Sequence, residues 1–248
     1  MVSVPHGRTN RLGGGHGLQY QLSRAFAGPF LHAMGRPRVV GMENVPATGA
    51  AILASNHLSI VDSVYLPLLV PRPVVFPAKA EYFSAKGPVG RLWAAYLRST
   101  NQLEINRDGA RAAQETLDAA LEILARGELF GFYPEGTRSP DGKLYRGRSG
   151  IGYLALNSGA PVIPVAMLGT RKMMPPGKSY LLPARIDMRI GKPLTFSDLA
   201  GVAPGKARRE VADRVMAAIG ELSGQEYVHM YASDRKAEMA AVTKKPKD

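Results

Sequence analysis

The chain has 248 residues, 45% of them hydrophobic, a formal net charge of +12 and no cysteine. The length suffices for one α/β domain and the composition argues against disorder, while the absence of cysteine excludes disulfides, thiolate zinc sites and thiol nucleophiles. The positive charge is compatible with three anionic partners: nucleic acid, an acidic membrane surface or a phosphate-bearing substrate. It is equally compatible with an ordinary solvated basic surface, so the charge alone does not distinguish among these possibilities.

The N-terminal segment is predicted to form an arm followed by a helix. Residues 1–17 are polar and glycine-rich and lack the apolar core of a secretory signal, and no run of about 20 apolar residues is present to cross a bilayer. Between Leu18 and Met34, apolar residues recur every four positions, as on one face of a helix. This helix either lies on an anionic bilayer, with Arg24 among its apolar positions, or packs on the domain with an interruption near Gly28-Pro29.

Strand and helix signals alternate through the next part of the chain. Apolar runs typical of strands occur at 50–54, 74–77, 129–133 and 161–168. Helical segments are predicted at 63–69, 89–98, 109–126 and 149–156. Residues 186–190 alternate apolar and charged side chains, which predicts an exposed edge strand.

This alternation predicts an α/β fold with a mixed central sheet flanked by helices. We expect three parts: residues 1–36 as an N-terminal arm and membrane-surface helix, 37–225 as the main domain, and 226–248 as a C-terminal helix and basic tail.

A first motif, Asn56-His57-Leu58-Ser59-Ile60-Val61-Asp62, follows the strand predicted at 50–54. Its histidine and aspartate cannot share one face of a continuous helix, because five residues advance roughly 500°. Ser59 and Asp62 form an S-x-x-D capping pattern, which predicts a helix that begins at Ser59, with His57 in the preceding loop and Asp62 able to reach back to it. Taken alone, the pair is also explained by a helix cap beside an ordinary loop histidine.

A second motif follows the strand predicted at 129–133. Glu135-Gly136-Thr137-Arg138 combines a flexible glycine, a hydroxyl group and an arginine. A guanidinium fits a phosphate bidentately, and backbone amides around Gly136 can add to an anion site. Taken alone, this loop is equally explained by a turn with a surface ion pair.

The two motifs, with two shorter blocks, resemble the glycerophosphate acyltransferase family, often called PlsC-like or lysophospholipid acyltransferases. N-H-L-S-I-V-D matches the family's N-H-x-S-x-x-D block, and Y-P-E-G-T-R-S matches F-P-E-G-T-R-S. Leu103-Glu104-Ile105-Asn106-Arg107 resembles the block that ends in I-x-R, and Val162-Ile163-Pro164-Val165 matches V-x-P-V. The four blocks occur in the family's order. Tyr133 stands where phenylalanine is usual and Asn106 where aspartate is common.

The resemblance implies a glycerophosphate acyltransferase-like fold and a role for each motif residue. His57 would be the general base and Asp62 its orienting partner, while Arg107 and Arg138 would hold the phosphate of the acceptor. The implied substrate-binding set is Arg107, Glu135, Gly136, Thr137, Arg138, Lys79 and Asn56. No metal or other cofactor is expected, and acyl-CoA or acyl carrier protein would be the co-substrate.

The chemistry also follows from physical reasoning. An alcohol is too weakly acidic to attack a thioester unaided, so a neutral imidazole must take its proton as the new bond forms. Asp62 would fix the tautomer of His57 and stabilise the imidazolium, as in a Ser-His-Asp site, with the substrate hydroxyl in place of the serine.

We therefore expect transfer of a fatty acyl group to the free hydroxyl of 1-acylglycerol 3-phosphate, giving phosphatidic acid in phospholipid biosynthesis. The alternatives are another lysophospholipid or glycolipid acceptor, or a non-catalytic basic module that binds acidic lipid or nucleic acid. Nucleic acid is disfavoured because no recognition helix or aromatic-basic strip is evident. A metal-dependent phosphohydrolase using His57, Asp62 and Glu135 is disfavoured by the scarcity of further histidines at ligand spacing.

A lipid acceptor implies contact with an anionic membrane. We expect peripheral or monotopic attachment at the cytoplasmic face of the cell membrane, through the helix at 18–34 and the segment 89–98. The latter carries Trp93 and Tyr96, residue types that suit the headgroup region.

Overall fold

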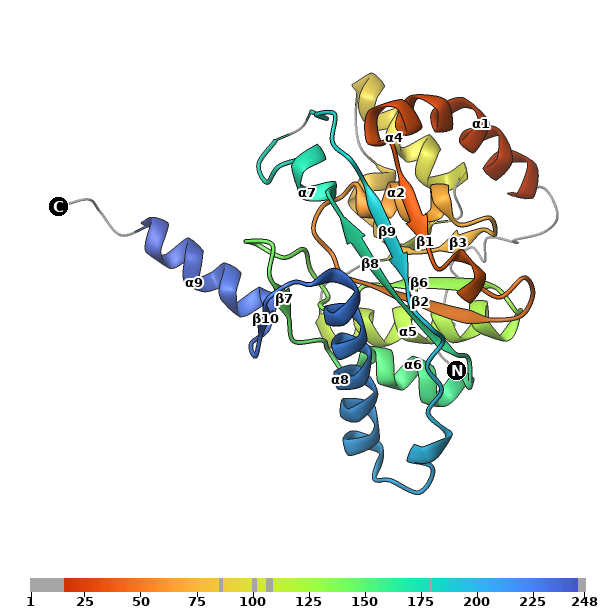
Figure 1. Cartoon of the computed structure of the whole chain (residues 1–248), viewed down its shortest axis with the longest axis vertical. Helices are drawn as coiled ribbons and strands as arrows, with labels where there is room; N and C mark the ends of the chain where they lie inside the picture. The colour runs from red at the N-terminus through yellow and green to blue at the C-terminus, as the bar shows by residue number, and fades with distance from the viewer. Residues whose placement is uncertain (1–15, 85–86, 100–101, 106–108, 179, 245–248) are drawn as a thin grey trace, which may run out of the picture.

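The computed structural model describes residues 16–84, 87–99, 102–105, 109–178 and 180–244. Its centre is a six-stranded mixed sheet (Figure 1). The strands lie in the order β1 (Arg38–Val40), β9 (Asp187–Ile190), β8 (Val162–Leu168), β2 (Ala51–Ser55), β6 (Leu129–Phe132) and β3 (Val74–Val75). Only the β8–β9 pair in this sheet is antiparallel. The predicted α/β class with a mixed central sheet is confirmed.

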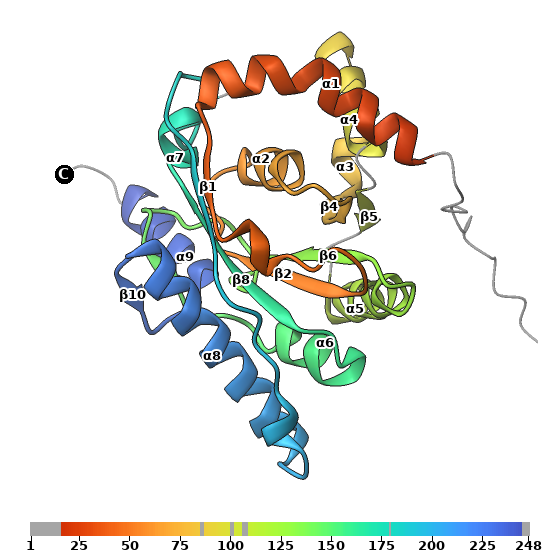
Figure 2. The same cartoon turned by 45° about the vertical axis from the view of Figure 1, so that its right-hand side comes forward.

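Helices cover both faces of the sheet (Figure 2). One face carries α5 (Gly109–Ala125), α6 (Gly150–Ser158) and α8 (Pro204–Ser223), and the other carries α1 (His16–Gly35) and α2 (Asp62–Leu69). The central strand β2 is buried on both sides: Ile52 and Ala54 pack into the first core, Ala51 and Leu53 into the second. This explains why residues 50–54 form an uninterrupted apolar run.

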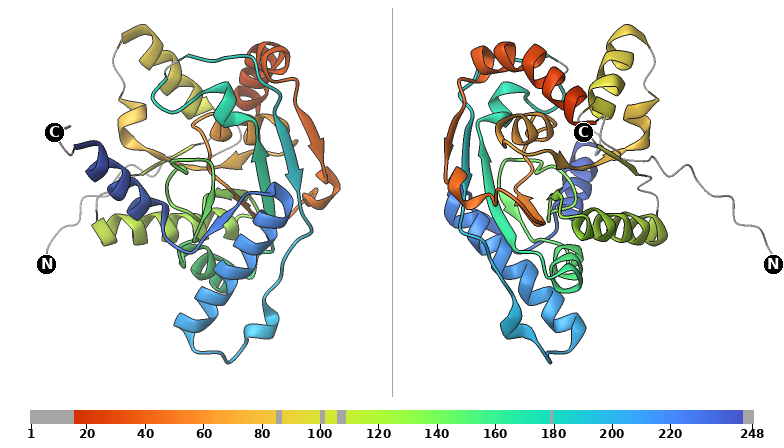
Figure 3. Two further views of the ribbon diagram at one scale, coloured as in Figure 1. Left: turned by 60° about the vertical axis from the view of Figure 1, so that its left-hand side comes forward. Right: turned by 90° about the vertical axis from the view of Figure 1, so that its right-hand side faces the viewer.

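The remaining elements are short or lie at the periphery. Two parallel pairs of strands stand apart from the main sheet: β4 (Pro77–Lys79) with β5 (Leu103–Ile105), and β7 (Leu144–Tyr145) with β10 (Tyr227–Val228). The other helices are α3 (Ala80–Phe83), α4 (Gly87–Ser99), α7 (Thr170–Met173) and α9 (Ala232–Lys244), with 3₁₀ turns at Met42–Asn44 and Ser197–Leu199. Helix α9 projects from the side of the molecule that carries β7 and β10 (Figure 3).

The predicted interruption of the N-terminal helix is wrong. Helix α1 continues through Pro29 to Gly35, because the residues after the proline are held against α2. Leu31 is buried there, and its carbonyl accepts a hydrogen bond from the hydroxyl of Tyr65 at 2.6 Å. Phe30, by contrast, is 60% exposed. The side chains of Leu18, Leu22 and Phe26 lie outside the described part of the structure.

The predicted exposed edge strand at 186–190 is also wrong. Strand β9 lies inside the sheet, because β1 pairs with it in parallel on its outer side, with Arg38 opposite Asp187. Met188 and Ile190 are buried, whereas the guanidinium of Arg189 donates a hydrogen bond to the carbonyl of Leu222 at 2.8 Å. The alternating pattern therefore correctly predicted a strand with one buried face. The predicted position of this strand at the edge of the sheet was wrong.

Among the described residues, no helix is both long enough and apolar enough to cross a membrane.

Candidate active site

The two sequence motifs meet at one edge of the central sheet. Strands β2 and β6 are parallel neighbours, with Ala54 opposite Phe132. His57 follows the carboxyl end of β2 and Glu135 follows that of β6, so both loops leave the sheet at the same edge. Open α/β sheets commonly carry their sites at this edge.

His57 and Asp62 form a pair within hydrogen-bond distance. Nδ1 of His57 lies 3.0 Å from Oδ2 of Asp62, which also accepts hydrogen bonds from the amides of Leu58, at 2.7 Å, and Ser59, at 2.8 Å. Asp62 is fully buried, and its Oδ1 has no hydrogen-bond partner within the described chain. The carboxylate therefore fixes both the imidazole and the loop that carries it.

The predicted helix start at Ser59 is wrong. Helix α2 begins at Asp62, and residues 59–62 form a turn closed by the hydrogen bond from the amide of Asp62 to the carbonyl of Ser59, at 3.2 Å. The amide of Ser59 donates to Asp62, as the capping pattern predicts, and Oγ of Ser59 accepts a hydrogen bond from the amide of Val61 at 3.4 Å. The predicted contact of Asp62 with His57 is present nevertheless.

Tyr133 sets the plane of the imidazole. Its ring stacks on that of His57 with centroids 3.9 Å apart and an interplanar angle of 9°. Its hydroxyl lies 3.0 Å from Oγ of Ser63, and its ring also stacks on Phe76. The sequence marked Tyr133 only as a departure from the usual phenylalanine, and no local signal predicted the stacking.

Glu135 ties the second motif to the first. It is buried, and its two oxygens accept hydrogen bonds from the amides of His57, at 3.1 Å, and Tyr145, at 3.0 Å. Burial raises the pKa of Glu135 to about 7, against the lowering effect of these two hydrogen bonds. The amide of Ser139 donates to the carbonyl of His57 at 2.7 Å. The peptide groups of His57 are thus held by both ends of the loop 135–139.

The middle of this loop is more accessible to solvent than its two ends, Glu135 and Ser139, which are buried. Gly136 has a φ of 72°, and a Cβ there would lie 3.2 Å from Cδ of Arg148, so the position favours glycine. Arg138 is exposed and Thr137 is half-buried. The Thr137 hydroxyl accepts a hydrogen bond from Nζ of Lys236 on α9. Arg148 and Lys236, which both lie outside the second motif, were not among the predicted site residues.

The predicted substrate-binding residues that remain are Asn56, Arg107 and Lys79. The Asn56 carboxamide is buried, exchanges hydrogen bonds with the backbone of Met167 at 2.7 and 3.0 Å, and donates to Gln225 at 2.7 Å. It links β2 to β8, and its role in substrate binding stays a prediction. Arg107 and the side chain of Lys79 lie outside the described residues.

The described residues include no group of three or more histidine, cysteine or acidic side chains arranged to hold a metal ion.

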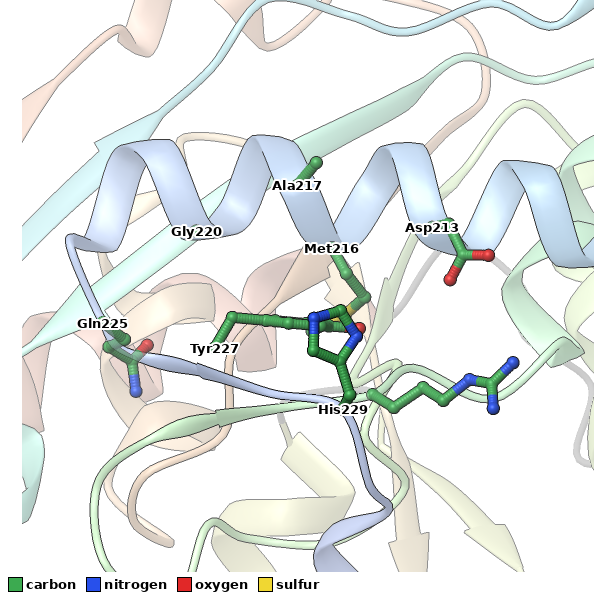
Figure 4. Close-up of a pocket in the computed structure, with 8 residues that line it drawn as sticks. Asp213, Met216, Ala217, Gly220, Gln225, Tyr227 and His229 are labelled. Carbon is green, nitrogen blue, oxygen red and sulfur yellow. The ribbon is translucent and has the colours of Figure 1, made fainter.

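A pocket of about 710 Å³ adjoins this region between α8 and β10 (Figure 4). Its lining residues are Arg146, Asp213, Met216, Ala217, Gly220, Gln225, Tyr227 and His229. Gln225 connects the pocket wall to Asn56, and so to the segment that precedes His57.

Comparison of the sequence with known proteins identifies relatives of this chain. The chain is 32% identical to a 1-acyl-sn-glycerol-3-phosphate acyltransferase of Chlamydomonas reinhardtii, over 70% of this chain and 51% of that protein. It is 29% identical to the chloroplastic LPAT1 of Arabidopsis thaliana, over 77% and 52% of the two chains. The match thus spans about half the length of these relatives. The Bacillus subtilis protein of the same name is 28% identical, over 72% of this chain and 83% of its own.

A solved structure of an acyltransferase has a similar fold. The crystal structure of the 1-acyl-sn-glycerophosphate acyltransferase PlsC from Thermotoga maritima superposes with a TM-score of 0.63 and 28% identity, covering 84% of this chain and 80% of that one. The model of the acyltransferase family matches residues 36–168, which contain both motifs. This match covers more than half of the sequence, and the chain therefore belongs to the acyltransferase family.

Proposed function

We propose that the protein transfers a fatty acyl group from an acyl thioester to the free hydroxyl of 1-acylglycerol 3-phosphate and so makes phosphatidic acid. The observation that carries this proposal is the His57–Asp62 pair. The loop 135–139 is hydrogen-bonded to the backbone of His57, and its accessible residues Thr137 and Arg138 are suited to bind a phosphate. The names of the relatives from algae, plants and Bacillus subtilis support the choice of acceptor.

The proposed reaction is a direct transfer. Nε2 of His57 takes the proton of the acceptor hydroxyl as its oxygen attacks the thioester carbonyl, and Asp62 stabilises the imidazolium that forms. The tetrahedral intermediate collapses, the C–S bond breaks, and the leaving thiolate receives the proton from the imidazolium. The products are one ester and one thiol, and no acyl-enzyme is required.

The phosphate supplies positioning. The loop 135–139 is hydrogen-bonded to the peptide groups of His57 at both ends, so an anion held by Thr137 and Arg138 lies close to the imidazole. Anchoring the acceptor in this way converts an encounter in solution into a reaction between groups already placed together. Arg107 and Lys79 keep their proposed role at the same phosphate.

We further propose that the acyl donor is acyl-CoA or acyl carrier protein, and that the protein works as a peripheral or monotopic protein on the cytoplasmic face of the cell membrane. The net charge of +12 and the exposed Phe30 of α1 support contact with an anionic lipid surface.

The test is thiol release from palmitoyl-CoA, or from palmitoyl carrier protein, in the presence of 1-acylglycerol 3-phosphate. We expect release by the wild type that depends on the acceptor and is lost in His57→Ala, with both proteins shown to be folded by circular dichroism. Release that continues in the variant would reject His57 as the base. If the folded wild type releases no thiol with either donor, acyl transfer to this acceptor is excluded.

A further inference from the structure

The C-terminal segment is docked onto the second motif. Strand β10 pairs with β7, and the amide of Arg146 donates to the carbonyl of Met230 at 3.0 Å. The guanidinium of Arg148 lies 4.8 Å from the ring centroid of Tyr231 and donates to Oγ of Ser233 at 3.0 Å. These contacts fix the start of α9 beside the loop 135–139, although α9 lies beyond the residues that the family model matches.

This docking brings Lys236 into the loop. Its side chain is half-buried, and Nζ donates to the hydroxyl of Thr137. Burial, and then the charge of Arg138, lower the pKa of Lys236, while the charge of Glu135 opposes them. In the part of the chain that the structure describes, neither Lys236 nor Arg138 forms an ion pair.

Arg138 in the loop and Lys236 on α9 are two cations at this contact, and neither has a carboxylate at ion-pair distance among the described residues. Such an arrangement favours a bound anion. Partial desolvation and the repulsion between the two cations cost free energy, which an anion with more than one charge offsets best. A phosphate monoester carries about −1.5 to −2 charges at pH 7 and three terminal oxygens. A phosphodiester carries a single charge and has two such oxygens. Arginine can bind two oxygens at once, and lysine and the threonine hydroxyl can each donate to an oxygen.

We propose that Lys236 of α9 is a specificity-determining residue of the acceptor site, which with Arg138 and Thr137 favours a phosphomonoester over a phosphodiester. The acceptors so distinguished are 1-acylglycerol 3-phosphate and lysophospholipids whose phosphate carries a further headgroup. This inference rests on the proposed acyl transfer.

The experiment compares two acceptors in four proteins. The variants are Lys236→Met, Lys236→Arg and the control Lys206→Met, which removes an exposed lysine of α8. The kcat and KM values are measured with 1-acylglycerol 3-phosphate and with 1-acylglycerophosphoglycerol, a phosphodiester, in micelles of the same composition. Competition by sn-glycerol 3-phosphate provides a measure of phosphomonoester binding that does not depend on the acyl chain.

We expect Lys236→Met to lower kcat/KM for the phosphomonoester by about tenfold or more, chiefly through KM, as for the loss of a charged hydrogen bond. The loss with the phosphodiester should be several-fold smaller, Lys236→Arg should retain much of the preference, and Lys206→Met should match the wild type. Inhibition by sn-glycerol 3-phosphate should weaken in Lys236→Met.

Two outcomes would overturn the inference separately from the proposed function. If the wild type transfers acyl groups and Lys236→Met keeps the wild-type ratio of the two acceptors, Lys236 does not set specificity. The same conclusion follows if both activities fall in proportion, because general damage to the site would act in that way. A folded wild type that acylates neither acceptor would reject the proposed function, and the inference with it.

Discussion

The side chain of Asp62 has two roles at the site. One carboxylate oxygen meets the His57 imidazole and two backbone amides, all within 3.0 Å. It therefore orients the ring and shapes the loop from which the ring projects. A substitution that changes only the charge of this group separates its electrostatic role from its size.

We expect Asp62→Asn to lower kcat about 10²- to 10⁴-fold with little change in KM, because an amide can stabilise the wrong tautomer and does not neutralise an imidazolium. The measurement is acceptor-dependent thiol release under saturating substrates. Thermal unfolding of the variant serves as the control for folding. A kcat within a few-fold of the wild-type value would contradict the assigned role.

Glu135 makes stability depend on pH. Its pKa is about 7 in the folded protein and 4.5 for an ordinary glutamate, so between these pH values the folded state holds more protons than the unfolded state. The free energy of unfolding should therefore be highest below pH 4.5, as far as this group is concerned, and fall as pH rises through 7. The difference in pKa corresponds to about 3 kcal/mol.

The check compares urea unfolding of the wild type and Glu135→Gln at pH 5 and pH 8. Glutamine does not titrate, so the loss of stability between these pH values should be smaller in the variant, whatever its absolute stability. Titrating groups away from Glu135 are common to both proteins and cancel in this comparison. An equal pH dependence of the two proteins would contradict the raised pKa.

At the scale of elements, helix α1 supports the site through α2. Tyr65 lies within the first turn and a half of α2, which begins at Asp62, and its hydroxyl is bonded to the carbonyl of Leu31 in α1. A Cβ at Gly35 would overlap the ring and hydroxyl of Tyr65, so the close approach of the two helices requires a glycine there. The position of Asp62 thus depends on how α1 packs.

We expect Gly35→Ala to lower the free energy of unfolding by about 1–3 kcal/mol through this overlap, and to lower kcat as α2 shifts. Gly28→Ala, in the same helix, is the matched control. Its Cβ would lie 3.9 Å from Cδ1 of Leu68, an ordinary contact, and alanine favours the helix. Urea unfolding of both variants measures the difference, and equal stabilities would show that α1 and α2 adjust freely.

The elements also show where sequence reasoning succeeds. The nearness of His57 and Glu135 was predictable, because each follows an apolar strand and parallel strands present their carboxyl ends at one edge. The internal position of β9 was not, because it depends on pairing with a strand about 150 residues earlier in the chain. Lys236 carried no local signal, since only the docking of α9 brings it to the loop. Arg148 carried none either, since a hydrogen bond from its amide to the carbonyl of Pro134 places it there.

At the scale of the whole molecule, the proposed contact with a membrane can be tested without disturbing the fold. Deletion of the residues before Arg36 is unsuitable, because it would remove Leu31 from the core and the hydrogen-bond partner of Tyr65. Phe30 is exposed on α1, and Val242, 73% exposed, lies on α9, which projects from another side of the molecule (Figure 1). The two residues give a matched pair of apolar surface positions.

We expect Phe30→Ser to reduce sedimentation with vesicles that contain anionic lipid, because a peripheral helix binds through its buried apolar area together with its charge. Val242→Ser should bind as the wild type does, and added salt should weaken binding of all three proteins, since the net charge of +12 contributes to it. Neither substitution removes a buried side chain, so unfolding midpoints should be unchanged. If Phe30→Ser binds like the wild type, or if both variants lose binding equally, the face that carries Phe30 is not the one that meets the lipid.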